Sequence, residues 1–257
     1  MRSSDDPSPV TVTPGGDCSP FLLLGDHAGR AIPRALGDLG LPAGALDRHI
    51  AWDIGVAGLG ARLSASLGAA FIAQAYSRLV IDCNRVPGSE GSIPEVSDGV
   101  QIPGNRGLDE TAIAARLGEI YQPYQDAIAA ELDRRAARGQ PTLLVSLHSF
   151  TPVFQGQARP WRMGVLHRQD SDLSRRVLGL LRAEFGEDAG DNEPYRMDAT
   201  DNTVPLHADP RGLDYLELEV RQDLIADAAG QAWAASLLAR VLTQAAGDGL
   251  DGRVEGR

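Results

Sequence analysis

The stretch 21–33 reads FLLLGDHAGRAIP and predicts a buried strand that ends at a histidine. Four large apolar residues in a row, 21–24, show no polar alternation, as expected for a strand covered on both faces. Gly25 and Gly29 flank His27 and let the backbone turn sharply around its imidazole. Open α/β sheets bind ligands beyond the carboxyl ends of their parallel strands. His27 is therefore a candidate ligand-binding residue, with a purely structural loop histidine as the alternative.

The composition is that of an ordinary globular protein. The 257 residues are 43% hydrophobic and 23% charged, which is sufficient for a substantial core. A net charge of −11 argues against a nucleic-acid or anionic-membrane surface, because neutralising phosphates needs clustered Lys and Arg. No apolar run approaches the length of a membrane span. The two cysteines form no CxxC motif and we see no signal peptide, so we expect a cytoplasmic protein.

Apolar periodicity predicts helices and strands in alternation. We expect helices over 43–68, 110–138, 172–185 and 224–246, and strands over 21–24, 69–75, 77–83, 141–147, 162–166 and 215–220. Pro123 should kink the second helix. This alternation predicts an α/β fold, a three-layer αβα sandwich with a mostly parallel central sheet. We expect residues 1–19 to form a flexible arm, 20–247 a single domain and 248–257 a flexible tail.

A second histidine, His148, follows another buried strand, as His27 follows the first. A catalytic zinc takes three nitrogen or oxygen ligands from the protein and leaves a fourth position for water. Asp53 is our candidate for the third ligand, because a carboxylate in an otherwise apolar helix is costly unless it is paired. His49 is the alternative, since it precedes Asp53 by four residues and shares its face of the expected helix. Asp53 could instead cap a backbone group or pair with Arg30.

The segment 77–85, SRLVIDCNR, carries two arginines and an asparagine around an apolar centre. Arginine side chains suit bidentate binding of a carboxylate, so Arg78 and Arg85 are candidate substrate-binding residues. Arg78 could also form only an ion pair with Asp82. Residues 84–107 show no periodicity, and a loop of this length is usually functional.

The expected strand 215–220 carries two glutamates, Glu217 and Glu219, that alternate with apolar residues and therefore face the same side. One of them could be solvated or paired with an arginine. The other could face the site and act as a general base.

Five of these segments together resemble the N-formylglutamate amidohydrolase family. They are HAGRAIP (27–33), WD (52–53), YSRLVIDCNR (76–85), LHSF (147–150) and LEVRQDL (218–224), in the family's order, and the resemblance covers about 22–246. The family is similar to the zinc carboxypeptidases and aspartoacylases. The resemblance therefore implies a zinc-exopeptidase-like αβα fold and one Zn²⁺ per chain, for which His27, Asp53 and His148 are our ligands.

The resemblance also implies roles for other residues. In the wider group an Asn-Arg pair binds the substrate carboxylate, and here that pair is Asn84 and Arg85. A strand glutamate in a Glu-Leu-Arg-Asp-like sequence serves as the base, and Glu219 matches it. We expect His207, in a polar loop, to add a donor to the same pocket.

Two positions depart from these relatives. The wider group takes two metal ligands from an HxxE motif, whereas Arg30 stands three residues after His27. Related deformylases place an aspartate two residues before the second histidine, whereas this chain has Ser146. The first departure is the reason that Asp53 replaces the usual glutamate in our ligand set.

The expected activity is metal-dependent hydrolysis of the acyl amide bond of an N-acyl amino acid, N-formyl-L-glutamate being the family's namesake. The alternatives are an aspartoacylase- or carboxypeptidase-like hydrolase of another acyl or peptide substrate, and a metal- or anion-binding relative without turnover. We expect a small carboxylate-bearing substrate and neither a nucleic-acid nor a membrane partner. The sequence does not indicate the oligomeric state.

Overall fold

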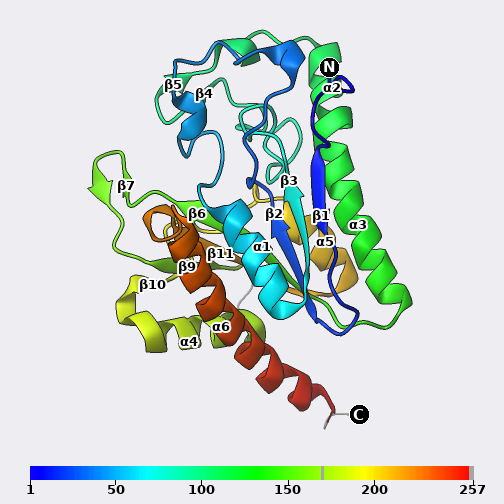
Figure 1. Cartoon of the computed structure of the whole chain (residues 1–257), viewed down its shortest axis with the longest axis vertical. Coiled ribbons are helices and arrows are strands. Elements are labelled where there is room, and N and C mark those ends of the chain that lie inside the picture. The colour runs from blue at the N-terminus through cyan, green and yellow to red at the C-terminus, as the bar shows by residue number, and fades with distance from the viewer. Residues whose placement is uncertain (169–170, 255–257) are drawn as a thin grey trace.

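The computed structural model describes residues 1–168 and 171–254, and a seven-stranded sheet lies at its centre (Figure 1). Across the sheet the strands are β1 (Val10–Thr13), β3 (Ala70–Gln74), β2 (Phe21–Gly25), β6 (Leu143–Phe150), β11 (Asp214–Arg221), β9 (Met163–Leu166) and β10 (Ala189–Asp191). The pairs β3–β2, β2–β6, β6–β11 and β9–β10 are parallel, and β1–β3 and β11–β9 are antiparallel. The predicted mostly parallel sheet is confirmed.

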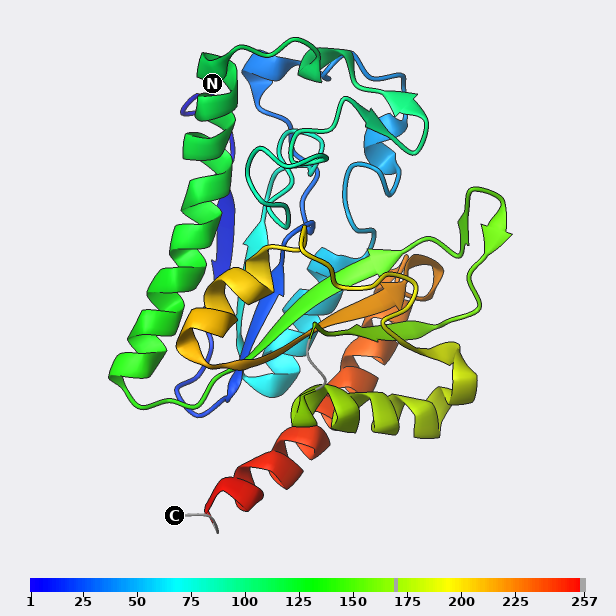
Figure 2. The same cartoon turned by 180° about the vertical axis from the view of Figure 1, so that it is seen from behind.

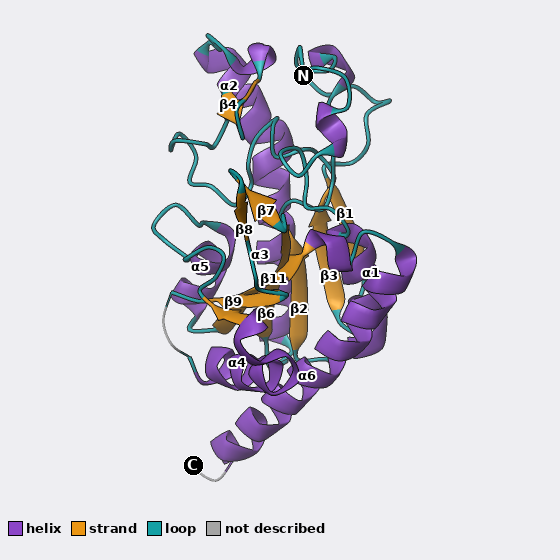
Figure 3. Ribbon diagram, turned by 90° about the vertical axis from the view of Figure 1, so that its left-hand side faces the viewer, coloured by secondary structure: helices purple, strands orange, loops and turns teal. Residues whose placement is uncertain are grey.

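Helices cover both faces of this sheet, which confirms the three-layer αβα arrangement (Figures 2 and 3). One face carries α1 (Val56–Leu67), α4 (Asp172–Phe185) and α6 (Ala228–Val254). The other carries α3 (Gln122–Ala137) and the short α5 (Thr203–Ala208). No helix in the described part of the chain is both long and apolar enough to cross a membrane.

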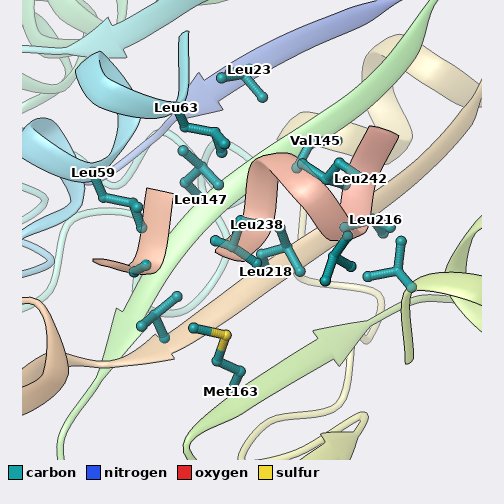
Figure 4. Close-up of a cluster of buried hydrophobic side chains, with 14 of the residues drawn as sticks. Leu23, Leu59, Leu63, Val145, Leu147, Met163, Leu216, Leu218, Leu238 and Leu242 are labelled. Carbon is teal, nitrogen blue, oxygen red and sulfur yellow. The ribbon is translucent and has the colours of Figure 1, made fainter. Parts of the chain in front are cut away.

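Two apolar clusters fill the two sides of the sheet and fix the direction of the strand side chains. Val145 and Leu147 of β6 belong to the cluster under α1 and α6, as do Leu216 and Leu218 of β11 (Figure 4). Because side chains alternate along a strand, the residues between them point to the opposite face. Those residues are Ser146, His148, Glu217 and Glu219.

Two small hairpins lie outside the central sheet. One joins β4 (Val96–Ser97) to β5 (Val100–Gln101) within the long segment 84–107. The other joins β7 (Val153–Phe154) to β8 (Gln157–Ala158) and extends beyond the end of β6 (Figures 1 and 2). Both hairpins therefore belong to loops near the carboxyl edge of the sheet.

The helix expected over 43–68 is shorter than its apolar spacing predicts. Only Ala45–Asp47 forms an isolated 3₁₀ turn, and α1 begins at Val56. The intervening chain is a loop held against the His27 loop, because the Asp53 amide donates to the His27 carbonyl at 2.9 Å. Gly55, at φ 88°, then turns the chain into α1. Our prediction that His49 and Asp53 share a helix face is therefore wrong.

The strand expected over 77–83 is also absent, and consecutive turns take its place. The Ser77 side chain donates to the Ala51 carbonyl and accepts from the Leu79 amide, and the Val80 amide bonds back to the Ser77 carbonyl. Leu79, Val80 and Ile81 are buried beneath the 84–107 loop and are not part of a sheet. Burial alone therefore does not show whether a segment is a strand.

The long helix expected over 110–138 is interrupted near Pro123. It consists of α2 (Glu110–Arg116), a π-helical turn (Leu117–Tyr121) and α3. Pro123 lies in the first turn of α3, directly after the π turn, where the missing amide of proline is accommodated.

The ends of the chain are more regular than the expected arm and tail. Val10–Thr13, within the expected arm, forms β1 in the sheet, and the α-amino group of Met1 lies 2.8 Å from the Glu119 carboxylate. Helix α6 continues to Val254, and residues 255–257 of the expected tail lie outside the described residues.

Candidate metal centre

His27, Asp53 and His148 meet at the carboxyl edge of the sheet. Each offers one ligand atom, and these atoms all lie within 4.8 Å of one another. The Asp53 Oδ2 atom lies 3.0 Å from His148 Nδ1 and 3.6 Å from His27 Nδ1. All three side chains are buried. The three residues predicted from the sequence can therefore hold one metal ion.

Three different kinds of local structure position these side chains. His27 lies in the turn after β2, whereas His148 lies within β6 rather than beyond it. Asp53 is in the loop before α1, where its Oδ2 accepts from the Ser149 amide at 3.2 Å. The loop containing Asp53 is thus tied by hydrogen bonds to both histidine segments.

Asp82 and Arg78 orient the first histidine. His27 Nε2 lies 2.7 Å from Asp82 Oδ1, and Arg78 Nη2 donates to Asp82 Oδ2 at 2.8 Å. Burial and the Arg78 charge lower the pKa of His27, but the carboxylates of Asp82 and Asp53 outweigh both effects and raise it. The ion pair that we considered for Arg78 is present, and Arg78 Nη1 also lies 3.4 Å from Asp53.

Asp26 and Ser146 orient the second histidine. Ser146 Oγ donates to Asp26 Oδ2 at 2.6 Å and lies 3.1 Å from His148 Nε2. Asp26 Oδ2 itself lies 3.4 Å from the same nitrogen. Burial opposes a charged imidazole, but Asp26 and Asp53 raise the pKa of His148 well above its ordinary value.

The donor set fits a catalytic zinc ion. Two imidazole nitrogens and one carboxylate oxygen are the ligand types that such sites use, and three protein ligands leave room for water. His27 Nδ1 is buried without a hydrogen-bond partner among the described residues, while its Nε2 is bonded to a carboxylate. A carboxylate on the outer nitrogen is the usual way in which a metal-binding histidine is oriented.

Two buried glutamates lie beside this centre. Glu219 pairs with His148 and Glu217 with Ser146 in the parallel register of β11 and β6, so these side chains share one face. Glu219 Oε2 has no hydrogen-bond partner among the described residues. Burial, with contributions from Asp53 and Glu217, raises the pKa of Glu219 to about 8. Burial raises the pKa of Glu217 to about 7.

Asn84 lies beside Glu217, but both ends of its amide are occupied. Its Oδ1 accepts from the backbone amides of Asn202 and Thr203 at the start of α5, at 3.0 and 2.9 Å. Its Nδ2 lies 3.5 Å from Glu217 Oε1. The side chain of Asn84 therefore connects the long loop, α5 and the glutamate strand.

Arg85 lies at the edge of a cavity next to the metal centre. Its Nη1 donates to Asp201 Oδ1 at 2.7 Å. The cavity, of about 270 Å³, is lined by Arg78, Asp82, Arg85 and residues of the 84–107 loop, with Phe154 of the β7–β8 hairpin. Arg85 is thus accessible from a space that adjoins the Asp82–His27 pair.

Two further histidines that the sequence suggested for the site, His207 and His49, lie outside the cluster. His207 is not in a polar loop but buried in α5, where its Nε2 lies 2.8 Å from Gln125 Oε1. Burial there lowers its pKa to about 4. His49 lines the cavity 3.5 Å from Asp98, away from the three candidate ligands. The structure therefore does not bring His207 to the metal centre.

The sequence interpretation did not include Asp26 in the site and treated Asp82 only as a pairing partner. Asp26 directly precedes His27, so its proximity to this candidate ligand was visible in the sequence. Its contact with Ser146 was not, because Asp26 lies in the turn after β2 whereas Ser146 lies in β6.

The fold and this cluster define an α/β protein with a buried group of two histidines and a carboxylate that could hold a metal ion. The N-formylglutamate amidohydrolase family matches residues 19–226, and the chain belongs to that family. No curated protein sequence matches the chain significantly.

Two solved structures extend this result. The gene product Atu2144 from Agrobacterium tumefaciens is 36% identical, with a TM-score of 0.90 over 96% of this chain and 98% of that one. An N-formylglutamate amidohydrolase from Ralstonia eutropha is 19% identical, with a TM-score of 0.69 over 93% of this chain and 97% of that one. At this identity, the second comparison establishes a shared fold.

Proposed function

We propose that this protein is a zinc-dependent amidohydrolase that removes the acyl group of an N-acyl amino acid, with N-formyl-L-glutamate as the first candidate substrate. His27, Asp53 and His148 would hold one Zn²⁺ per chain. The observation that supports this most directly is the convergence of the three ligand atoms beside Glu219, whose Oε2 has no partner in the described part of the chain. The family of the chain supports amide hydrolysis as the reaction.

Zinc would supply the Lewis acid that polarises the acyl carbonyl and makes a water molecule acidic enough to attack it. Glu219 would accept a proton from that water, since it neighbours His148 in register and its Oε2 has no hydrogen-bond partner within residues 1–168 and 171–254. The same carboxylic acid would then donate the proton to the amine nitrogen as the amide C–N bond breaks. The products are formate, or another carboxylate, and a free amino acid.

The raised pKa of the buried Glu219 carboxylate bears on this proton transfer. A pKa of about 8 in the absence of a cation keeps Glu219 protonated near neutrality, and a neighbouring cation would favour the ionised form that a base requires. Glu217 lies one pleat away and bonds to Asn84, so it is less available to a water at the metal centre.

We propose that Arg85 binds the carboxylate of the substrate and that Arg78 and Asn84 form part of the site around it. Arg78 already pairs with Asp53 and Asp82, and Asn84 caps α5, so Arg85 is the member of the three best placed to contact a carboxylate in the cavity. An incoming carboxylate would compete with Asp201 for its guanidinium. His207 would support α5 and not the substrate.

A panel of N-formyl and N-acetyl amino acids, assayed with zinc and after removal of metal by a chelator, tests this function. We expect zinc-dependent release of free amine, restored when zinc is returned. Peptide substrates in the same panel separate deacylation from carboxypeptidase-like cleavage. The absence of metal-dependent amide hydrolysis across the panel would overturn the proposal.

A further inference from the structure

Arg159 holds a positive charge at the end of the hairpin that leaves β6. It directly follows β8, and its guanidinium carbon lies over three aromatic rings. The distances to the ring centres are 4.6 Å for Phe154, 4.7 Å for Tyr195 and 5.9 Å for Phe150. Such a cradle holds a planar guanidinium in place while leaving its edge available for hydrogen bonds.

The hydrogen bonds of Arg159 leave much of its donor capacity unused. Its Nη1 donates to Tyr195 Oη at 3.0 Å and to Thr151 Oγ1 at 3.2 Å, both neutral acceptors. Among the residues that the structure describes, no carboxylate oxygen lies within 4.0 Å of its guanidinium. An arginine has five N–H donors, so an anionic acceptor can still bind here.

Tyr195 links this arginine to the candidate base. The carbonyl of Glu193 passes so close to Gly164 that a Cβ atom at position 164 would lie 1.9 Å from it. Gly164 is the antiparallel partner of Glu219 in β9, and the same Cβ position lies 3.5 Å from Glu219 Cβ. The chain 193–195 therefore crosses the sheet beside Glu219. Burial and the Glu219 charge both raise the pKa of Tyr195, in agreement with this placement.

Phe154 links the same arginine to the cavity. This ring lies under the guanidinium and also lines the space that contains Arg78, Asp82 and Arg85. Arg159 thus adjoins this cavity through the Phe154 ring.

Buried carboxylates surround the candidate metal centre, and the arginines nearest to it are already paired with carboxylates. Asp26, Asp53, Asp82, Glu217 and Glu219 are all buried close to the metal centre. The arginines on the other side of the cavity have partners, since Arg78 pairs with two of these aspartates and Arg85 with Asp201.

We propose that Arg159 binds a carboxylate of the substrate and sets the preference of the enzyme for carboxylate-bearing N-acyl amino acids. Phe150, Phe154 and Tyr195 orient the guanidinium for this contact. The inference rests on the proposed function for the identity of the substrate, but its test measures binding and does not depend on turnover.

The test uses N-formyl-L-glutamate and its two monoamides, N-formyl-L-glutamine and N-formyl-L-isoglutamine. Their binding to the metal-free protein is measured by titration calorimetry for wild type, Arg159→Ala and Arg159→Lys. Arg162→Ala is the matched control, because Arg162 also stacks on two aromatic rings, Phe185 and Trp233, but against α4 and α6 on the opposite face.

We expect the wild type to bind the diacid at least tenfold more tightly than one of the monoamides. Arg159→Ala should weaken diacid binding about ten- to a hundredfold and remove that selectivity, as expected for the loss of a charge-assisted hydrogen bond. Arg159→Lys should recover part of it, because an ammonium group cannot form the guanidinium fork. Arg162→Ala should keep the selectivity of the wild type.

Equal selectivity in wild type and Arg159→Ala, or no selectivity in the wild type, would overturn the inference. A thermal melt of each variant separates this result from a loss of folding. If Arg159 only joined the hairpin to Tyr195, Arg159→Lys would not restore any of the diacid selectivity. Hydrolysis by the zinc-loaded wild type is measured separately. Intact selective binding without hydrolysis would refute the proposed function while supporting the role of Arg159.

Discussion

Asp26 Oδ2 lies 3.4 Å from His148 Nε2, and Ser146 Oγ hydrogen-bonds to both groups. The sequence comparison with related deformylases singled out position 146, where this chain has serine in place of their aspartate. Here the serine occupies that position, and a carboxylate from the neighbouring turn takes its place beside the imidazole. In this chain the carboxylate beside His148 therefore comes from the turn after β2, and His148 Nδ1 is directed at Asp53.

Loss of this carboxylate should weaken metal binding. Asp26→Asn should raise the dissociation constant for zinc about ten- to a hundredfold, as found when outer partners of metal-binding histidines are removed. Competition with a zinc-binding dye measures the affinity without an activity assay. Ser146→Asp added to Asp26→Asn should restore most of it, because residues 146 and 148 point to one face.

Asp191→Asn is the control for this experiment. Asp191 also accepts a hydrogen bond from a histidine, His167 at 2.8 Å, but outside the metal centre. Its replacement should leave zinc affinity unchanged, and an unchanged affinity in Asp26→Asn as well would show that the carboxylate is not needed.

The identity of the third ligand can be decided by metal analysis. Asp53→Ala should lose stoichiometric zinc, because it removes the carboxylate oxygen that faces both Nδ1 atoms. His49→Ala should retain zinc, since His49 lies beside Asp98 instead. Full zinc content in Asp53→Ala together with loss in His49→Ala would mean that the ligand set is wrong.

The two strand glutamates should differ in their effect on turnover. Glu219→Gln should lower kcat by about 10²- to 10⁴-fold while zinc remains bound, which is the usual contribution of a general base. Glu217→Gln is the matched variant and should change kcat much less. Near wild-type turnover in zinc-loaded Glu219→Gln would defeat the proposed mechanism.

Removing the guanidinium of Arg85 should affect substrate binding rather than the chemical step. Arg85→Ala should raise KM about ten- to a hundredfold, and Arg85→Lys should recover only part of this. Because Arg85 also pairs with Asp201, Asp201→Asn serves as the control for loss of the ion pair alone. If Asp201→Asn raised KM as much as Arg85→Ala, the effect would come from loop position and not from substrate contact.

The metal-free protein should lose stability as Glu217 ionises. Its pKa of about 7 is above the ordinary value of 4.5, so its contribution to stability is complete below pH 4.5 and is lost as the pH rises through 7. Glu217→Gln cannot ionise. The difference in free energy of unfolding between Glu217→Gln and wild type should therefore grow by about 3 kcal/mol in favour of the variant as the pH rises from 4.5 to 8. This follows from about 1.36 kcal/mol for each unit by which the Glu217 pKa is raised.

Urea denaturation in the presence of chelator measures this difference at each pH. Glu184→Gln, at an exposed position in α4, is the control. A gap between wild type and Glu217→Gln that does not change with pH would contradict the assignment of a buried, neutral Glu217.

Several features of the fold and site could be predicted from the sequence because they depend on local patterns. The run 21–24 predicts a fully buried strand, and alternation with apolar residues puts Glu217 and Glu219 on one face. The family motifs also pointed to His27, Asp53 and His148 as a group, and the structure brings these three residues together.

Other features depend on contacts between distant segments. Apolar spacing over 43–68 suggested a helix, yet the loop around Asp53 bonds to the His27 turn and so lies outside α1. Periodicity reports which residues are buried, and a buried loop can show the same spacing as a helix. His207 was likewise expected in a polar loop, whereas packing against Gln125 of α3 buries it in α5.

The sequence by itself determined which side chains could take part in the chemistry, since residue types and strand alternation are local properties. Only the tertiary structure decided their partners: Asp26 with Ser146 and His148, Arg85 with Asp201, and Arg159 with its three rings. These pairings join segments from different strands and loops. Their geometry follows from strand order and loop packing, which no single stretch of the chain specifies.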